Sequence, residues 1–377
     1  MKTVLILSAD GGGGHISAAQ AITHALPEFD VKTVCTFDTV LGKTDPLSIL
    51  TGNRWNIHHF YNYCLYRRWY PLVNFHEPVL WYLKAQSGRI KRMIGDYIDK
   101  TNPVAIISVA PIVNWIILQV AQERNIPFIM IPTDLDSSLF LPGIKKPSYS
   151  KLRVCIPFND PQIHAYINKA QLNEEQLVVT GFPIRPDFFN QADSASIKKE
   201  FGIPSGKPVV MVMLGAQGSR IAYEFADQLS QVHVPMHAII CLGKQEQLKE
   251  HILQLRRNPH VSFTVLGFTS RIADLMSISD LIITKSGTVS ICEAMYKELP
   301  MILDATGGVL RWERFNHNFI TGKGFGTCLT QIKQTCSMVT ELLLHPTALH
   351  DYKKNLINFD KNHGTTHIKA VLNQLLQ

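Results

Sequence analysis

The sequence predicts an α/β protein built from two Rossmann-like, doubly wound domains that face each other across a cleft. The chain of 377 residues is too long for one ordinary hydrophobic core. In both halves, short apolar runs alternate with helical stretches, which is typical of parallel sheets. Between the halves, a polar stretch over residues 183–208 holds four prolines and interrupts that alternation.

The N-terminal half supplies the first domain, which we expect over residues 1–186. It begins with an apolar run, a glycine loop and an alanine-rich helix over residues 17–26. The apolar runs predict strands over residues 4–7, 31–37, 104–108, 128–131 and 153–156.

The second domain is expected over residues 187–355, and a closing segment, 356–377, is expected to hold a helix that packs back on the N-terminal domain. Ligands of doubly wound domains bind at the carboxyl ends of the strands, so we expect the site in the crevice between the domains. The predicted strands of this half cover residues 209–214, 237–241, 262–266, 281–284 and 301–303, with a helix over 289–296.

Composition excludes several classes of protein. Apolar residues make up 46% and charged residues 18%, which is typical of a folded chain. Seven cysteines, an odd number without a CxxC pair, favour reduced thiols in the cytoplasm over disulfides or a zinc site. The most apolar window, residues 104–120, is interrupted by polar residues and is shorter than the roughly 20 residues of a membrane span. We therefore expect a cytoplasmic protein without a spanning segment.

The first glycine loop runs from Asp10 to His15, between a predicted strand and a predicted helix. Its glycines, Gly13 and Gly14 among them, allow close approach of the backbone to a ligand. Neither a dinucleotide fingerprint nor a P-loop fits the spacing here or at Gly42. An unperturbed histidine titrates near neutral pH, so His15 is a candidate general base. The alternative is a histidine that only caps or packs on the loop.

A second cluster follows the predicted strand at residues 281–284. The turn Ser286-Gly287-Thr288 precedes a helix, so its backbone N–H groups and hydroxyls are suited to a diphosphate. Glu293, about two turns into that helix, is a candidate for binding both ribose hydroxyls. Its alternative interpretation is a solvated helix carboxylate.

Residues 54–92 form a basic aromatic stretch. It contains seven Lys or Arg residues but only one acidic residue, Glu77. Ten aromatic residues lie between Trp55 and Tyr82, both included. This composition favours a peripheral contact with an anionic membrane. A helix pair with buried aromatics and a solvated basic face is the alternative; nucleic-acid binding is disfavoured because no recognised module accompanies the charge. The predicted membrane contacts are Trp55, Arg67, Arg68, Trp69, Trp81, Arg89, Lys91 and Arg92.

Four blocks of the sequence resemble the monogalactosyldiacylglycerol synthases and processive diacylglycerol glucosyltransferases of glycosyltransferase family 28. The blocks are LILSADGGGGHISAAQAI, VVTGFPIRPDF, VLGFTSRIADLMSISDLIITKSGTVSICEAM and ERFNHNF. Their order and spacing extend over nearly the whole chain. The resemblance implies a GT-B fold and inverting transfer of a hexose from a UDP-sugar to a lipid acceptor such as diacylglycerol. It also implies no metal cofactor, and peripheral association with the inner face of the cell membrane.

The resemblance also assigns roles to individual residues. His15 and Asp10 are the predicted catalytic residues, and Gly13, Gly14 and Asp134 the predicted acceptor-binding residues. The predicted donor-binding residues are Gly215, Phe268, Lys285, Ser286, Gly287, Thr288, Ser290, Glu293, Glu313 and Asn316.

The sequence departs from the family pattern at three places. Trp312 stands where the family commonly has a glutamine that holds the donor sugar, and Ala110 stands where a histidine is expected. The pair Thr133-Asp134, which matches a Thr-Asp pair of the family, is followed by Ser138 and Leu141 in place of a histidine and a tryptophan. Three alternatives therefore stay open: an N-acetylglucosaminyl transferase with a polyprenyl-linked acceptor, a sugar-nucleotide 2-epimerase, and a non-catalytic UDP-sugar-binding protein.

Overall fold

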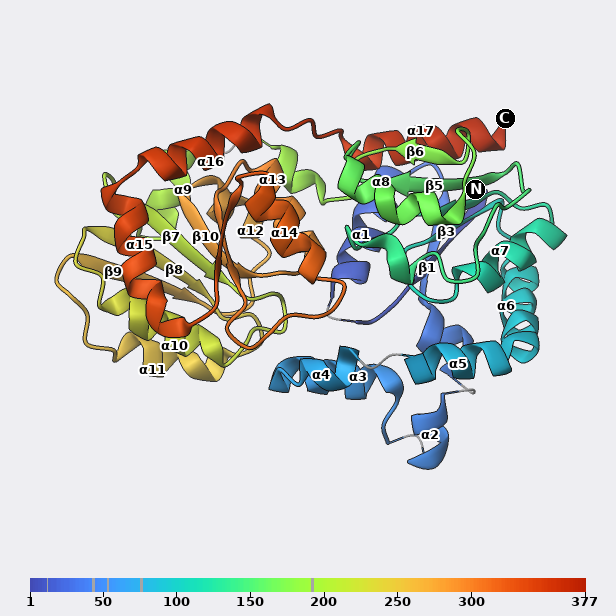
Figure 1. Cartoon of the computed structure of the whole chain (residues 1–377), viewed down its shortest axis with the longest axis horizontal. Helices are drawn as coiled ribbons and strands as arrows, with labels where there is room; N and C mark the ends of the chain where they lie inside the picture. The colour runs from blue at the N-terminus through green and yellow to red at the C-terminus, as the bar shows by residue number, and fades with distance from the viewer. Residues whose placement is uncertain (12, 43–44, 53, 75–76, 191–192) are drawn as a thin grey trace. The chain divides into compact units, whose positions relative to one another are not determined.

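The computed structural model describes the chain except residues 12, 43–44, 53, 75–76 and 191–192 (Figure 1). Gly12 of the predicted glycine loop therefore lies outside the described residues. So do Lys43 and Thr44 of the sequence Gly42-Lys43-Thr44, which does not fit a P-loop. The chain divides into two compact units. The first contains Met1–Arg185, Leu310–Trp312 and Asp360–Gln377, and the second contains Pro186–Val309 and Glu313–Phe359.

The first unit is built on a parallel sheet with the strand order β2-β1-β3-β4-β5-β6 in the part of the chain that the structure describes. The chain runs from β1 to β2 on one side and returns to β3 on the other side of β1. The topological switch point therefore lies between β1 and β3, where doubly wound sheets bind ligands. The strands are β1 (Thr3–Ser8), β2 (Asp30–Cys35), β3 (Ala105–Ser108), β4 (Phe128–Met130), β5 (Leu152–Ile156) and β6 (Leu177–Val179).

Helices pack on this sheet. The helix α17 packs against α1, and its Ile368, Val371 and Leu372 join the core formed by the inner strands. Figure 1 shows α17 in red beside the first unit's strands. The helices of this unit are α1 (Gly14–Ala25), α2 (Pro46–Leu50), α3 (Ile57–Arg67), α4 (Tyr70–Asn74), α5 (Glu77–Ala85), α6 (Ser87–Thr101), α7 (Asn114–Glu123), α8 (Pro161–Ile167) and α17 (Gly364–Leu376).

The return of the chain to the first unit depends on two glycines. Gly181 has φ +94°, and a Cβ there would lie 2.2 Å from the carbonyl oxygen of Asn362. A Cβ on Gly364, the first residue of α17, would lie 2.1 Å from the carbonyl oxygen of Phe182. Both residues must be glycine for the two backbones to meet at this distance.

The second unit holds a parallel sheet with the order β12-β11-β10-β7-β8-β9 within the described residues. The chain runs outward from β7 to β9 and returns to β10, so the switch point lies between β7 and β10. The strands are β7 (Val209–Met213), β8 (Met236–Cys241), β9 (Val261–Leu266), β10 (Leu281–Lys285), β11 (Met301–Asp304) and β12 (Gly326–Leu329).

The helices of the second unit pack on an apolar core. The central strands are buried along most of their length, and Phe225 and Leu229 of α10 are fully covered against them. The helices are α9 (Ser194–Glu200), α10 (Ile221–Ser230), α11 (Lys249–Leu253), α12 (Ile272–Ser277), α13 (Thr288–Tyr296), α14 (Arg314–Gly322), α15 (Thr335–Leu344) and α16 (Thr347–Asn358).

The prediction of an α/β protein with two parallel sheets is confirmed. Each predicted strand is present within one or two residues of its expected bounds. The sequence patterns missed β6 and β12, which are short edge strands; β6 is half-buried throughout and β12 has mixed burial. Among the described residues, no helix has the length and apolar character that crossing a membrane requires.

Candidate functional site

The glycine loop of the first unit lies at the carboxyl end of β1, beside the switch point of that sheet. Gly13 caps α1 with φ +89°, a left-handed conformation that a side chain would strain. Gly11 is confined by a neighbouring ring, because a Cβ there would lie 3.3 Å from Cε1 of Tyr61. The carbonyl oxygen of Asp10 accepts a hydrogen bond of 3.0 Å from Nδ2 of Asn62 in α3. The loop is therefore anchored to α3, and the Asp10 side chain is exposed.

His15, in the first turn of α1, is half-buried and contacts residues that follow β4. Its Nδ1 lies 2.6 Å from the hydroxyl of Thr133, which is only 3% exposed. The ring also lies 6.3 Å from that of Phe140. Thr133 precedes Asp134, so the structure brings His15 next to the Thr-Asp pair. A bond from Nδ1–H to Thr133 leaves the lone pair of a neutral imidazole on Nε2.

The end of β3 forms the neighbouring wall of this switch point. Ile112 has φ +61°, a strained conformation for a β-branched residue, and its N–H donates to the carbonyl oxygen of Leu139 at 2.7 Å. Asn114 is buried; its Oδ1 accepts from the Ser108 hydroxyl at 2.6 Å and its Nδ2 donates to the carbonyl oxygen of Ala110 at 2.9 Å. The backbone at the position of the missing family histidine is thus held by a buried polar network.

In the second unit, the turn after β10 is held from α14. The amide of Asn316 is fully buried, and Nδ2 donates to the carbonyl oxygen of Ser286 at 2.6 Å and to the hydroxyl of Thr288 at 3.1 Å. Gly287 joins the strand to α13 with φ −69° and ψ 130°. Asn316 therefore fixes the shape of the predicted diphosphate turn, and its own side chain is covered by protein.

The side chain of Lys285, at the end of β10, lies against Gly215 after β7 and Gly287 after β10, at the switch point of the second sheet. Added Cβ atoms on Gly215 and Gly287 would lie 3.0 Å and 3.1 Å from the same Cε of Lys285. The carboxylate of Glu313 lies near Gly287, with Oε1 3.7 Å from the position of that Cβ. Burial raises the pKa of the Glu313 carboxyl, while the positive charge of Lys285 acts in the opposite direction. These four residues, all predicted donor-binding residues, lie together at the carboxyl ends of β7 and β10.

The inner face of α13 carries the remaining predicted donor residues. Thr288, Ser290 and Glu293 are 3%, 9% and 5% exposed. Glu293 is therefore not the solvated helix carboxylate that was the alternative interpretation. Phe268 follows β9, and 64% of its surface is exposed.

Two residues near the turn were missed by sequence reasoning. His317, the residue after Asn316, bonds through Nε2 to the hydroxyl of Ser286, and its Nδ1 lies 3.0 Å from the Cys328 sulfur on β12. Burial lowers the pKa of His317, and the nearby carboxylate of Asp304 acts in the opposite direction. No sequence pattern signalled this contact, because it depends on the unpredicted strand β12.

The basic aromatic stretch folds into α3 to α6 and the segment that precedes them. Trp55 and Trp69 pack edge-to-face on Tyr63 at centroid distances of 5.7 Å and 5.9 Å, and Arg67 lies over the same ring. Lys91 is ion-paired with Glu123. Large apolar side chains are at least 40% exposed at Ile49, Leu50, Trp55, Phe60, Trp69, Leu72 and Trp81. We call the described residues of 49–92 the amphipathic surface. Four of its aromatic side chains are exposed (Trp55, Phe60, Trp69 and Trp81) and its tyrosines are half-buried, whereas the alternative expects buried aromatics.

Trp312 does not lie in the second unit. With Leu310 it packs on Cys64 and Val73 of α3 and α4. The N–H of Arg311 donates to Oδ1 of Asn74 at 2.7 Å, and its guanidinium pairs with Glu77. The position of the family's sugar-binding glutamine is therefore occupied by a side chain that packs on the helices of the amphipathic surface.

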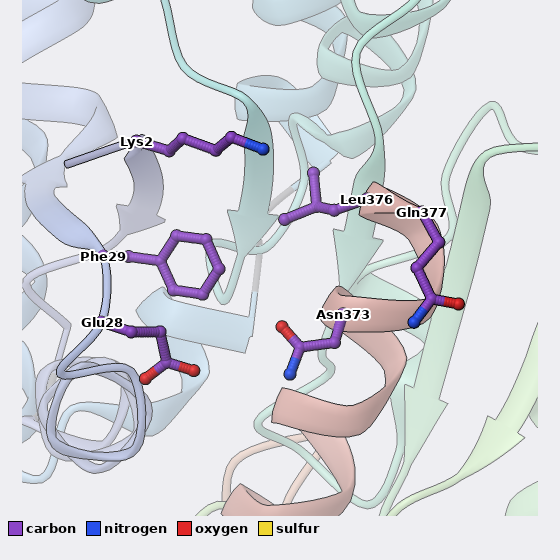
Figure 2. A pocket seen from close by; sticks show the side chains of 6 residues that line it. All are labelled: Lys2, Glu28, Phe29, Asn373, Leu376 and Gln377. Carbon is purple, nitrogen blue, oxygen red and sulfur yellow. The ribbon is translucent and has the colours of Figure 1, made fainter.

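An open pocket at the other end of the first sheet is separate from these residues. Figure 2 shows its lining from the amino ends of β1 and β2 and the end of α17, with Phe29 pointing between Lys2 and Asn373. It does not adjoin the carboxyl ends of the strands, where His15 lies. No cluster of three or more His, Cys, Asp or Glu side chains suited to a metal occurs in the described part of the chain.

Known proteins share the fold of this chain. The Acinetobacter baumannii MurG structure matches with a TM-score of 0.64 at 14% sequence identity, covering 99% of this chain and all of that one. The architecture is thus that of the GT-B glycosyltransferases. Residues 209–344 match the glycosyltransferase family 28 C-terminal domain, so the second unit carries that domain and the predicted resemblance is confirmed.

Two curated relatives are similar over most of this chain. The processive diacylglycerol beta-glucosyltransferase of Bacillus subtilis is 24% identical over 366 residues, which cover 94% of this chain and 90% of the relative. Monogalactosyldiacylglycerol synthase 1 of Arabidopsis thaliana is 27% identical over 369 residues, covering 90% of this chain. This chain spans 64% of the length of that plant enzyme.

Proposed function

We propose that this protein is an inverting glycosyltransferase that moves a hexose from a UDP-sugar to a lipid acceptor such as diacylglycerol. The observation that supports it most is the arrangement at the switch point of the second sheet, inside the family 28 domain. There a braced Ser-Gly-Thr turn joins β10, which ends at Lys285, to α13, which carries the buried Glu293. The relatives named above act on diacylglycerol, which motivates the acceptor class.

On the donor side, we assign the diphosphate to the turn Ser286–Thr288 and the ribose to Glu293. The amino end of α13 carries partial positive charge, and Lys285 adds a full charge beside Gly287. This charge stabilises the leaving UDP as negative charge develops on it, so the donor site requires no metal ion. Phe268, exposed after β9, is assigned to the uracil through its backbone.

On the acceptor side, we assign His15 as the general base. Donation from its Nδ1–H to Thr133 holds the tautomer in which Nε2 accepts the proton of the acceptor hydroxyl. The loop residues Asp10, Gly13 and Gly14, together with Asp134, surround that hydroxyl in the proposal. Removal of its proton makes the acceptor oxygen the nucleophile that displaces UDP with inversion.

We further propose that the amphipathic surface contacts the anionic inner face of the cell membrane. Its exposed Trp and Leu side chains are suited to the headgroup level, and Arg67, Arg89 and Arg92 add exposed positive charge. Lys91 contributes less, because Glu123 already neutralises it.

The test is UDP release by the purified protein in the presence of UDP-glucose, UDP-galactose or UDP-N-acetylglucosamine, with liposomes that contain diacylglycerol or a polyprenyl phosphate. We expect diacylglycerol-dependent release with a hexose donor, unchanged by EDTA. Release only with UDP-N-acetylglucosamine and the polyprenyl acceptor would overturn the acceptor assignment. Formation of the 2-epimer without lipid, or UDP binding without turnover, would overturn the transferase itself.

A further inference from the structure

A chain of three side chains, which we call the relay, leads away from the proposed diphosphate turn. Ser286 in the turn is hydrogen-bonded to Nε2 of His317 on α14, and Nδ1 of His317 is in contact with the Cys328 sulfur on β12 at 3.0 Å. The three residues come from three different elements of the second unit. The following inference rests on the proposed function, because it concerns how that turn holds the donor.

The hydroxyl of Ser286 has one proton, so its direction decides what the turn offers to a ligand. If the hydroxyl donates to Nε2, it presents only lone pairs to the outside, which repel a diphosphate. If Nε2–H donates to Ser286, the serine proton is available for a phosphate oxygen. A hydrogen bond to a charged oxygen is the stronger kind, so the second arrangement is suited to an anionic ligand.

Cys328 decides between these arrangements through the tautomer of His317. Burial raises the pKa of the Cys328 thiol to about 11, so it retains its proton at neutral pH. The thiol then donates from S–H to Nδ1, which places the imidazole proton on Nε2. The charged group that faces the ring from β11 is Asp304, whose Oδ1 already accepts from the N–H and hydroxyl of Thr306 at 2.9 Å and 2.7 Å.

We propose that His317 is a positioning residue of the donor site, and that Cys328 sets its tautomer so that Ser286 donates its hydroxyl proton to the diphosphate of the UDP-sugar. This role differs from that of Asn316, which fixes the backbone of the same turn. It also gives a function to two residues that no donor-site expectation from the sequence included.

The test compares UDP with uridine, because only UDP carries the diphosphate. Calorimetry would measure both affinities in wild type and in His317→Leu, His317→Gln, Cys328→Ala and Cys328→Ser. His317→Leu is expected to weaken UDP about tenfold, the effect of losing a hydrogen bond to a charged group, and to leave uridine unchanged. His317→Gln places an amide donor near Nε2 and is expected to restore most of the affinity.

Cys328→Ala is expected to weaken UDP several-fold, because Nδ1 loses its donor, and Cys328→Ser to restore it. Cys336→Ala, at another half-buried cysteine of the same unit, is the matched control and should bind UDP as wild type does. Equal loss of UDP and uridine affinity in His317→Leu and His317→Gln would mean a merely structural residue and would overturn the relay. Unchanged UDP affinity in all four variants would also overturn it. Wild type that binds no UDP would instead refute the proposed function.

Discussion

The two units present the same local plan, a strand followed by a turn and a helix, and they hold that turn in different ways. In the second unit, Asn316 and His317 of α14 bond to the turn after β10. Ser286, Thr288 and Asn316 are almost fully covered, and His317 is half-buried. In the first unit, the loop after β1 is half-exposed, and Thr133 is the bonded partner of its histidine.

This difference matches what each turn is proposed to bind. A nucleoside diphosphate has fixed shape and charge, and backbone N–H groups bind it only from a turn of fixed shape. In the proposal, a lipid hydroxyl reaches His15 from a membrane surface, and this requires an accessible loop. The comparison predicts that changes in the second unit alter nucleotide affinity, while changes in the first alter turnover or membrane binding.

The largest effect is expected from removing the proposed base. His15→Ala should lower kcat by about 10²–10⁴-fold, the usual contribution of a general base, with little change in UDP affinity. UDP release at saturating donor and lipid measures this. His24→Ala, an exposed histidine on the same helix, is the control and should retain wild-type turnover. An unchanged kcat in His15→Ala would show that His15 is not the general base.

The next effect concerns Glu293, the carboxylate proposed to bind the ribose in the second unit. Glu293→Gln keeps the shape of the buried side chain but loses its charge, so UDP affinity should fall by about tenfold or more. Calorimetry measures this, and binding to vesicles should not change. Glu341→Gln on the exposed side of α15 serves as the control. Loss of vesicle binding with unaltered UDP affinity would contradict the division between the units.

The stability of the second unit should also depend on pH through a buried histidine. His237 on β8 is 2% exposed and bonds to the hydroxyls of Ser262 and Thr264 at 2.8 Å and 3.0 Å; burial lowers its pKa to about 4. Between about pH 4 and pH 6.5, His237 is therefore neutral in the folded state and protonated in the unfolded state. The stability of the second unit should fall as pH drops from about 6.5 to about 4, by at most about 3 kcal/mol.

Chemical unfolding across this pH range measures the slope, and His237→Gln should flatten it. His260→Gln, an exposed histidine of the same unit, should keep the wild-type slope. A slope that is identical in wild type and His237→Gln would assign the acid sensitivity to other groups.

The smallest effect is expected at the amphipathic surface. Replacing Arg67, Arg89 and Arg92 by Ser should weaken binding to anionic vesicles at low salt, by up to about 1 kcal/mol per charge. The difference should shrink at high salt, because exposed charges are screened. Vesicle sedimentation measures it, and replacement of Lys249, Arg256 and Lys333, exposed cations of the second unit, by Ser is the matched control. An equal loss of vesicle binding in both triple variants would mean that net charge, and not the amphipathic surface, determines the binding.

The amino-acid sequence predicts most strands of both sheets and the turn after β10, and the features that it does not predict have physical causes. The buried inner strands are continuous apolar runs, so their positions followed from composition alone. The edge strand β12 contains Gly326 and a half-buried Cys328, and its pattern carried no comparable signal. The strand end at β10, with Gly287 and a helix after it, predicts a phosphate-binding turn from the sequence alone.

Contacts between distant residues were not accessible in this way. His317 bonds to Ser286, and His15 to Thr133, at separations of 31 and 118 residues. Each contact depends on which strands are neighbours in the sheet, which no local pattern specifies. Likewise, the packing of Trp312 on α3 and α4 could not be inferred from its replacement of a glutamine.

The central claim is that UDP binds on the turn between β10 and α13, and amide hydrogen exchange with and without UDP tests it most directly. We expect UDP to slow exchange at the amides of residues 286–293 and to leave those of α15 and of the loop after β1 unchanged. Saturating UDP that slows exchange elsewhere and leaves residues 286–293 unchanged would contradict the account.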